Sequence, residues 1–153
     1  MKKFILALFI TLGSFAAQAQ DMEWHTDMNK AMQLSTTSGK PMLLFFTGSD
    51  WCGWCMKLQK EVLKTTEFAT WAKENVILVE VDFPRRTAQA DTLKQQNAGL
   101  AQALGVRGYP TVWFVSTAKT AEGKVNLTPL GSTGYVAGGT TAWLATANPI
   151  IKK

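Results

Sequence analysis

Residues that bind metal ions or build disulfide frameworks are scarce in this chain. Among its 153 residues there are two cysteines and one histidine. Cys52 and Cys55 are three positions apart, and His25 lies far upstream of them. A structural zinc site takes four ligands, usually Cys and His. Zinc is therefore the weaker interpretation of the cysteine pair, and we expect neither a metal ion nor an organic cofactor.

Runs of basic residues and apolar stretches of membrane-spanning length are also missing. The formal net charge is +5, and the internal basic pair Arg85-Arg86 is most simply explained by a solvated loop. No basic stripe interleaved with aromatic residues indicates nucleic-acid binding. The apolar stretch at residues 4–15 is shorter than the roughly 20 residues that a transmembrane helix needs. We therefore expect no nucleic-acid partner and no stable membrane insertion.

The N-terminus has the features of a secretory signal peptide. Lys2 and Lys3 precede the apolar stretch, and Ala17-Gln18-Ala19 forms a small-x-small cleavage site. No cysteine follows that site, so we expect no lipid anchor there. We predict a signal peptide at residues 1–19 and one mature domain at residues 20–153, soluble in the bacterial periplasm or another extracytoplasmic space. Disulfides persist in such compartments.

The two cysteines form the motif Trp51-Cys52-Gly53-Trp54-Cys55. Cysteines three positions apart on the first turn of a helix share one face, within the Cα separation of roughly 4.4–6.8 Å that a disulfide needs. A disulfide closing a four-residue loop stabilises a fold by only about 2 kcal/mol. A purely structural disulfide is thus the alternative, and a dithiol that opens and closes is the favoured interpretation.

The motif lies where a buried strand meets a helix. Residues 41–46 form a continuous apolar run, residues 47–50 have turn chemistry, and helical spacing begins at Cys52. The positive end of a helix favours an anion, and the pKa of a cysteine thiol falls there. We expect Cys52 to be the nucleophile and Cys55 the resolving cysteine.

The remaining pattern alternates helices and strands. Between the turn signals we expect helices at Trp24–Ser38, from Cys52 to about Lys64, from Thr65 through Ala72, from about Ala88 to Leu104 and from about Thr140 to Asn148, and strands at 42–47, Val76–Phe83, Thr111–Val115 and Val125–Leu130. Pro149 should stop the last helix, and Gly123 should make the tight turn before the last strand. This order predicts an α/β fold with a central mixed sheet and helices on both faces.

Two motifs resemble the thioredoxin fold: W-C-G-x-C after a buried strand, and Gly108-Tyr109-Pro110-Thr111 before another strand. The resemblance implies a cis Pro110 opposite the cysteines and a Tyr109 main chain that pairs with substrate. Trp51, Gly53 and Trp54 complete the expected substrate-binding set. More narrowly, the chain resembles secreted bacterial thioredoxin-like proteins, in the segments Thr47–Cys55, Val81–Pro84, Gly105–Thr111 and Tyr135–Gly139.

One feature of ordinary thioredoxin is missing. Where that family has a buried Asp beneath the dithiol, paired with a Lys on the neighbouring strand, the candidate positions here are Phe45 and Phe46, and Leu78 on the neighbouring strand. A buried carboxylate would assist proton transfer to and from Cys55. Water, Asp50 or the substrate must serve instead.

The resemblance implies a thiol-disulfide oxidoreductase outside the cytoplasm. Trp54 adds no charge between the cysteines, so a potential between roughly −270 and −180 mV is expected rather than one near −120 mV. We expect a reductase or isomerase of disulfides in secreted proteins, rereduced by a membrane electron donor. The alternatives are a dithiol oxidase and a non-catalytic module that binds secreted clients on its tryptophan-lined surface. The other tryptophans, Trp24, Trp71, Trp113 and Trp143, are expected in the core.

Overall fold

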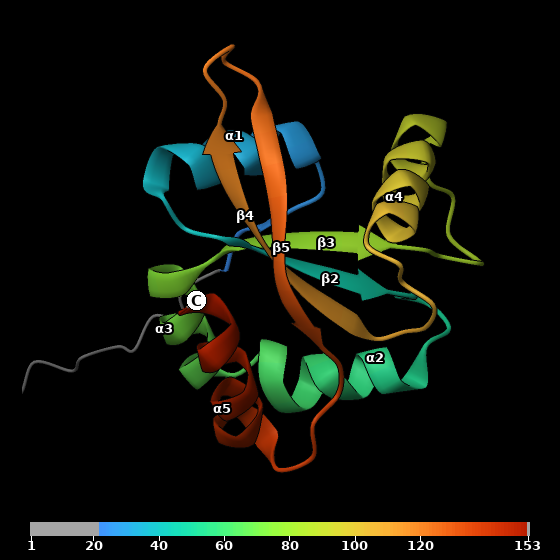
Figure 1. Ribbon diagram of the computed structural model, residues 1–153. Helices are drawn as coiled ribbons and strands as arrows, with labels where there is room; N and C mark the ends of the chain where they lie inside the picture. The colour runs from blue at the N-terminus through green and yellow to red at the C-terminus, as the bar shows by residue number, and fades with distance from the viewer. Residues whose placement is uncertain (1–21, 153) are drawn as a thin grey trace, which may run out of the picture.

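A five-stranded mixed sheet organises the part of the chain that the computed structural model describes, residues 22–152 (Figure 1). Its strands lie in the order β1-β3-β2-β4-β5. Strands β1, β3 and β2 are mutually parallel, whereas β4 runs antiparallel to β2 and β5 antiparallel to β4. The strands are β1 (Trp24–His25), β2 (Met42–Thr47), β3 (Ile77–Asp82), β4 (Thr111–Lys119) and β5 (Val125–Thr133).

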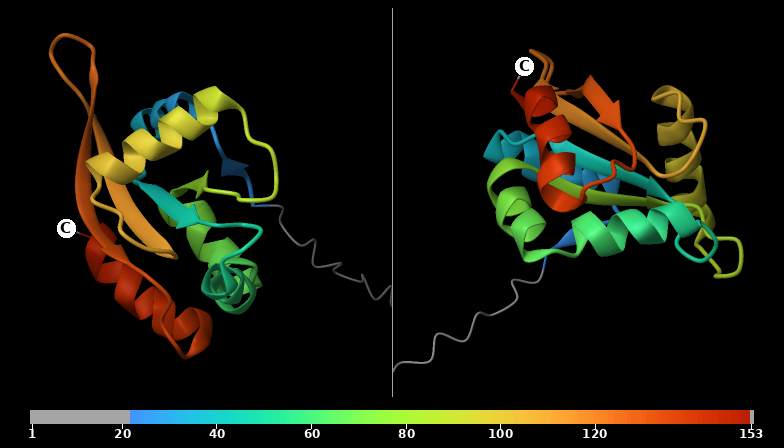
Figure 2. Two further views of the ribbon diagram at one scale, coloured as in Figure 1. Left: turned by 90° about the vertical axis from the view of Figure 1, so that its right-hand side faces the viewer. Right: turned by 90° about the horizontal axis from the view of Figure 1, so that it is seen from below.

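Helices cover both faces of this sheet, as Figures 1 and 2 show. Helices α1 (Met28–Ser38) and α4 (Asp91–Ala103) pack on one face. The other face carries α2 (Gly53–Leu58), its π-helical continuation η1 (Gln59–Leu63), α3 (Thr66–Asn75) and α5 (Gly139–Ile151). The predicted fold class, a mixed sheet between two helical layers, is confirmed.

Strand β2 lies at the centre, and all six of its side chains are buried. Leu43 and Phe45 face the layer of α2, α3 and α5, whereas Leu44 and Phe46 face the layer of α1 and α4. A strand covered on both faces needs no polar alternation. That is why its sequence is a continuous apolar run, and why the prediction of strand 42–47 was correct.

The predicted first helix begins too early. Trp24 and His25 form a short strand that pairs with Leu78 and Val79 of β3, and α1 starts only at Met28. The side chain of Asp27 accepts hydrogen bonds from the N–H groups of Asn29 and Lys30. An N-cap of this kind fixes where a helix begins.

The predicted end of the last helix is also wrong, because α5 continues through Pro149 to Ile151. Proline removes one backbone hydrogen bond, here in the last turn, where its ring is exposed. Ile150 and Ile151 pack against the core on the α2 side. This contact maintains the final turn.

The tryptophans expected in the core differ in burial. Trp143 is fully buried, and its indole N–H donates to the Gly134 carbonyl. Trp24, Trp71 and Trp113 are half-buried at the margins of the two core clusters. Gly123 occupies the β4–β5 turn with φ +77°, as predicted.

Residues 1–19, predicted as a signal peptide, lie outside the described residues. Within residues 22–152, no helix combines the length and apolar character that crossing a bilayer requires.

Candidate active site

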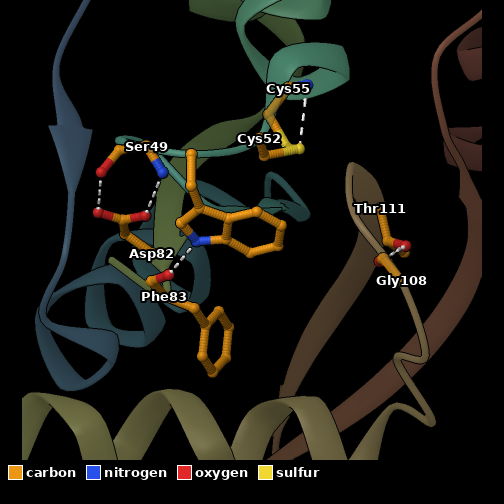
Figure 3. The surroundings of a disulfide bond; sticks show 8 residues. Ser49, Cys52, Cys55, Asp82, Phe83, Gly108 and Thr111 are labelled. Carbon is orange, nitrogen blue, oxygen red and sulfur yellow. Dashed lines mark hydrogen bonds between the residues drawn. A yellow bond between two sulfur atoms is a disulfide. The ribbon is translucent and has the colours of Figure 1, made fainter. Parts of the chain in front are cut away.

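Cys52 and Cys55 form a disulfide with their Cα atoms 5.2 Å apart. Cys52 is the N-cap residue of α2, and its Sγ accepts a hydrogen bond of 3.2 Å from the Cys55 N–H (Figure 3). The turn after β2 holds this position, because the Cys52 N–H donates to the Gly48 carbonyl at 2.8 Å. When the disulfide is reduced, a Cys52 thiolate therefore lies at the positive end of a helix.

The two cysteine residues differ in exposure to solvent. Cys52 is 6% exposed, whereas Cys55 is 1% exposed. Both residues belong to the core cluster that includes Phe45 and Leu58. An incoming client thus meets Cys52 first. The assignment of Cys52 as nucleophile stays a prediction, and this asymmetry supports it.

Trp51 is fixed by contacts on several sides. Its indole N–H donates to the Phe83 carbonyl at 2.8 Å, and its ring meets the Tyr109 ring edge-on at 5.8 Å between centroids. A side chain at Gly48 would collide with the indole. Trp51 is accordingly half-buried, so only part of its surface is open to the substrate that the sequence predicts it to bind.

Trp54 is the exposed tryptophan of the motif, at 59%. Its ring lies 5.3 Å from the ring of Tyr135, and the Lys57 ammonium lies 5.3 Å from both ring centroids. The Tyr135 hydroxyl donates to Glu61 at 2.6 Å, which raises the pKa of Tyr135. Sequence reasoning noted residues 135–139 only as a family feature and missed this cluster.

The Gly108–Thr111 segment faces the disulfide from the start of β4 (Figure 3). Its Tyr109–Pro110 peptide bond is cis. The Thr111 hydroxyl donates to the Gly108 carbonyl at 2.8 Å, and the Tyr109 ring packs 5.3 Å from that of Phe83. Gly53 is exposed, with open space around its Cα. The five predicted substrate-binding residues therefore lie around the disulfide, although Trp51 is partly covered.

Phe45, not Phe46, replaces the missing acid. Phe45 shares a core cluster with both cysteines, whereas Phe46 lies on the opposite face of the sheet. The register pairs Phe45 with Glu80 on β3, and paired residues of adjacent strands point to the same face. Burial, and next the charge of Asp82, raise the pKa of Glu80. An acid therefore lies on the neighbouring strand, beside the position where thioredoxin has its buried Asp. Leu78, Glu80 and Asp82 are every second residue of β3, and this spacing could have indicated that Glu80 shares the face of Leu78.

Asp50 is poorly suited to be the proton acceptor. Its carboxylate accepts hydrogen bonds of 2.9, 2.7 and 2.9 Å from the N–H groups of Arg85, Arg86 and Thr87. These bonds lower the pKa of Asp50 to about 2, far below the thiol value of roughly 8.5. Asp82 is likewise engaged, because it accepts from the Ser49 N–H and hydroxyl. Both carboxylates position loops.

A cysteine pair at a helix N-terminus, at the same end of the sheet as the Gly108–Thr111 segment, can exchange disulfides with other thiols. The fold and the site define a thiol-disulfide oxidoreductase.

Comparison with known proteins agrees with this class. Residues 28–128 match the thioredoxin-like domain. The chain is 35% identical over 134 residues to the disulfide bond reductase DsbH of Chlamydia pneumoniae, covering 88% of this chain and 75% of that protein. A solved structure described as DsbH oxidoreductase is similar with a TM-score of 0.78 at 32% identity, over 95% of each chain. A thioredoxin from Thermus thermophilus, 16% identical, shares the fold with a TM-score of 0.61, over 84% of this chain and 86% of that one. The chain belongs to the thioredoxin-like family.

Proposed function

We propose that this oxidoreductase reduces or isomerises disulfides in secreted proteins outside the cytoplasm. The observation that carries the proposal is the placement of Cys52, at the N-terminus of α2 and more exposed as a residue than Cys55. The name of the similar DsbH protein, a disulfide bond reductase, favours the reducing direction. The predicted signal peptide supports an extracytoplasmic, periplasmic location.

The reaction has two exchange steps. In the reduced protein the Cys52 thiolate attacks one sulfur of the client disulfide, the client S–S bond breaks, and the departing client sulfur takes a proton from solvent. Cys55 then loses its proton and attacks the Cys52 Sγ of the mixed disulfide. The second client sulfur leaves as a thiol, and the Cys52–Cys55 disulfide forms. Two electrons have passed to the client.

Another protein must return those two electrons. Since pyridine-nucleotide-dependent reductases are cytoplasmic, the proposed donor is a membrane protein that carries electrons outward. The partners are thus disulfide-containing or thiol-containing secreted proteins on one side and this donor on the other.

Trapping of the mixed disulfide tests the roles of the cysteines. With Cys55→Ser, the second step is blocked, so clients should accumulate covalently linked to Cys52. The matched variant Cys52→Ser should trap none. Mass spectrometry of both variants identifies the linked residue, and an adduct on Cys55 in Cys52→Ser would overturn the assignment.

A third variant, with both cysteines replaced by serine, distinguishes an enzyme from a binding module. A module that only holds clients on the Trp54 surface would keep its client affinity with both cysteines replaced by serine and would form no mixed disulfide. An oxidase would instead transfer its disulfide to reduced clients faster than its reduced form opens client disulfides.

A further inference from the structure

Arg85 forms a cation–π contact with Trp51 of the cysteine motif. Its guanidinium carbon lies 3.7 Å from the centroid of the Trp51 ring. Trp51 directly precedes Cys52, so the cation lies over the ring of the residue next to the proposed nucleophile. An arginine stacked on a ring keeps its in-plane N–H donors available for a planar anion.

The active-site loop itself fixes this contact. Asp50 binds the backbone N–H groups of Arg85, Arg86 and Thr87. Trp51, the next residue, is fixed by the Phe83 carbonyl and the Tyr109 ring. Two consecutive residues of the motif therefore position both the cation and the ring that it covers. The loop at 84–90 accordingly lies beside the N-terminus of α2 in Figure 2.

Arg85 is an exposed residue, and its guanidinium has no carboxylate partner among residues 22–152. The two acids of the active-site loops are occupied, Asp50 by backbone N–H groups and Asp82 by Ser49. Lys57, the cation beside Trp54, differs in this respect because Glu61 pairs with it at 3.8 Å. Arg85 thus has a charge left for a ligand, and it is the arginine that stacks on a ring of the cysteine motif.

We propose that Arg85 binds an aspartate or glutamate side chain of the client next to its reactive cysteine, so that the protein prefers disulfides flanked by acidic residues. The guanidinium fork matches a carboxylate with two parallel hydrogen bonds. This inference rests on the proposed function. It gives Arg85, which the sequence suggested to be one half of a solvated basic pair, a role in client selection, and it gives none to Arg86.

Three disulfide-linked peptides test it, identical except for Glu, Gln or Lys beside the cysteine. The second-order rate constant for their reduction in a single turnover is measured with the reduced parent protein and with reduced Arg85→Gln, Arg85→Glu and Arg86→Gln. An exposed ion pair contributes about 0.2–1 kcal/mol, which corresponds to roughly a 1.4- to 5-fold change in the rate constant. The parent should prefer the Glu peptide over the Gln peptide by about that factor, and less at high salt.

Arg85→Gln should abolish the preference, and Arg85→Glu should invert it toward the Lys peptide. Arg86→Gln is the matched control, since it removes the same charge from the same loop and should keep the preference. A parent without preference, or equal loss of preference in both Gln variants, would overturn the inference alone. Failure of the parent to reduce any of the three peptides would overturn the proposed function as well. A uniform loss on all peptides in Arg85→Gln would mean that Arg85 acts on the thiol, contrary to the inference.

Discussion

Replacing Phe45 by aspartate restores the acid of ordinary thioredoxin in a site built for a phenyl ring. Phe45 is 1% exposed and belongs to the same core cluster as both cysteines. Losing a buried phenyl ring costs about 3–5 kcal/mol. The new carboxylate would also lie opposite Glu80, one strand away on the same face. Two such charges about 5 Å apart repel by about 3 kcal/mol at an effective dielectric of about 20.

The free energy of unfolding of Phe45→Asp should therefore fall by at least about 4 kcal/mol at pH 7, a large share of the stability of a small domain. The loss should be smaller at pH 5, where the new carboxyl can protonate. Urea titration of the oxidised protein, followed by circular dichroism, measures both values.

A second substitution tests the cause of the loss. Adding Glu80→Lys converts the repulsion into attraction and should recover part of the stability of Phe45→Asp. It should recover none for Phe46→Asp, because Phe46 is buried on the opposite face. Phe45→Asp unfolding at the same urea concentration as the parent would show that the position is wet, and the argument from the buried ring would be wrong.

Three further predictions concern the surrounding groups. Because burial raises the pKa of Glu80, the folded state binds more protons than the unfolded state just above pH 4.5, so stability falls as the pH rises through that window. Glu80→Gln should remove this decline in urea titrations at several pH values. The pKa of Asp50 is instead lowered to about 2, so its contribution is present above about pH 4 and is lost as the pH falls through about 2. Asp50→Asn should speed amide hydrogen exchange at residues 85–87 at neutral pH, whereas exchange as slow as in the parent would contradict the loop assignment. Gly48→Ala should displace the Trp51 indole and destabilise the fold by about 1–3 kcal/mol; unchanged stability and tryptophan fluorescence would contradict the close approach.

The sequence predicted those parts of the molecule that local chemistry determines. Strand β2 is apolar throughout because both of its faces are covered, and the cysteine motif follows it at once. The two-residue strand at Trp24 is too short to show any periodicity, so the sequence predicted its residues as part of the helix that follows. The cap at Asp27 was a readable signal for the true start of that helix.

The missed features depend on pairings between distant segments. Glu80 lies beside Phe45 only through the register of β2 and β3. The Asp50 carboxylate binds backbone N–H groups 35 to 37 positions later, and backbone groups carry no sequence signature. The stacking of Arg85 on Trp51 follows from that loop closure. Tertiary contacts of this kind become visible only when the strands are placed.

The equilibrium of the Cys52–Cys55 couple with glutathione buffers tests the central claim most directly. Gly53 and Trp54 place no charge between the cysteines, so a reductase or isomerase should equilibrate between roughly −270 and −180 mV. Alkylation of the free thiols across a series of glutathione ratios gives that value. A potential near −120 mV would identify an oxidant, and a disulfide that stays closed under every reducing condition would contradict thiol-disulfide exchange altogether.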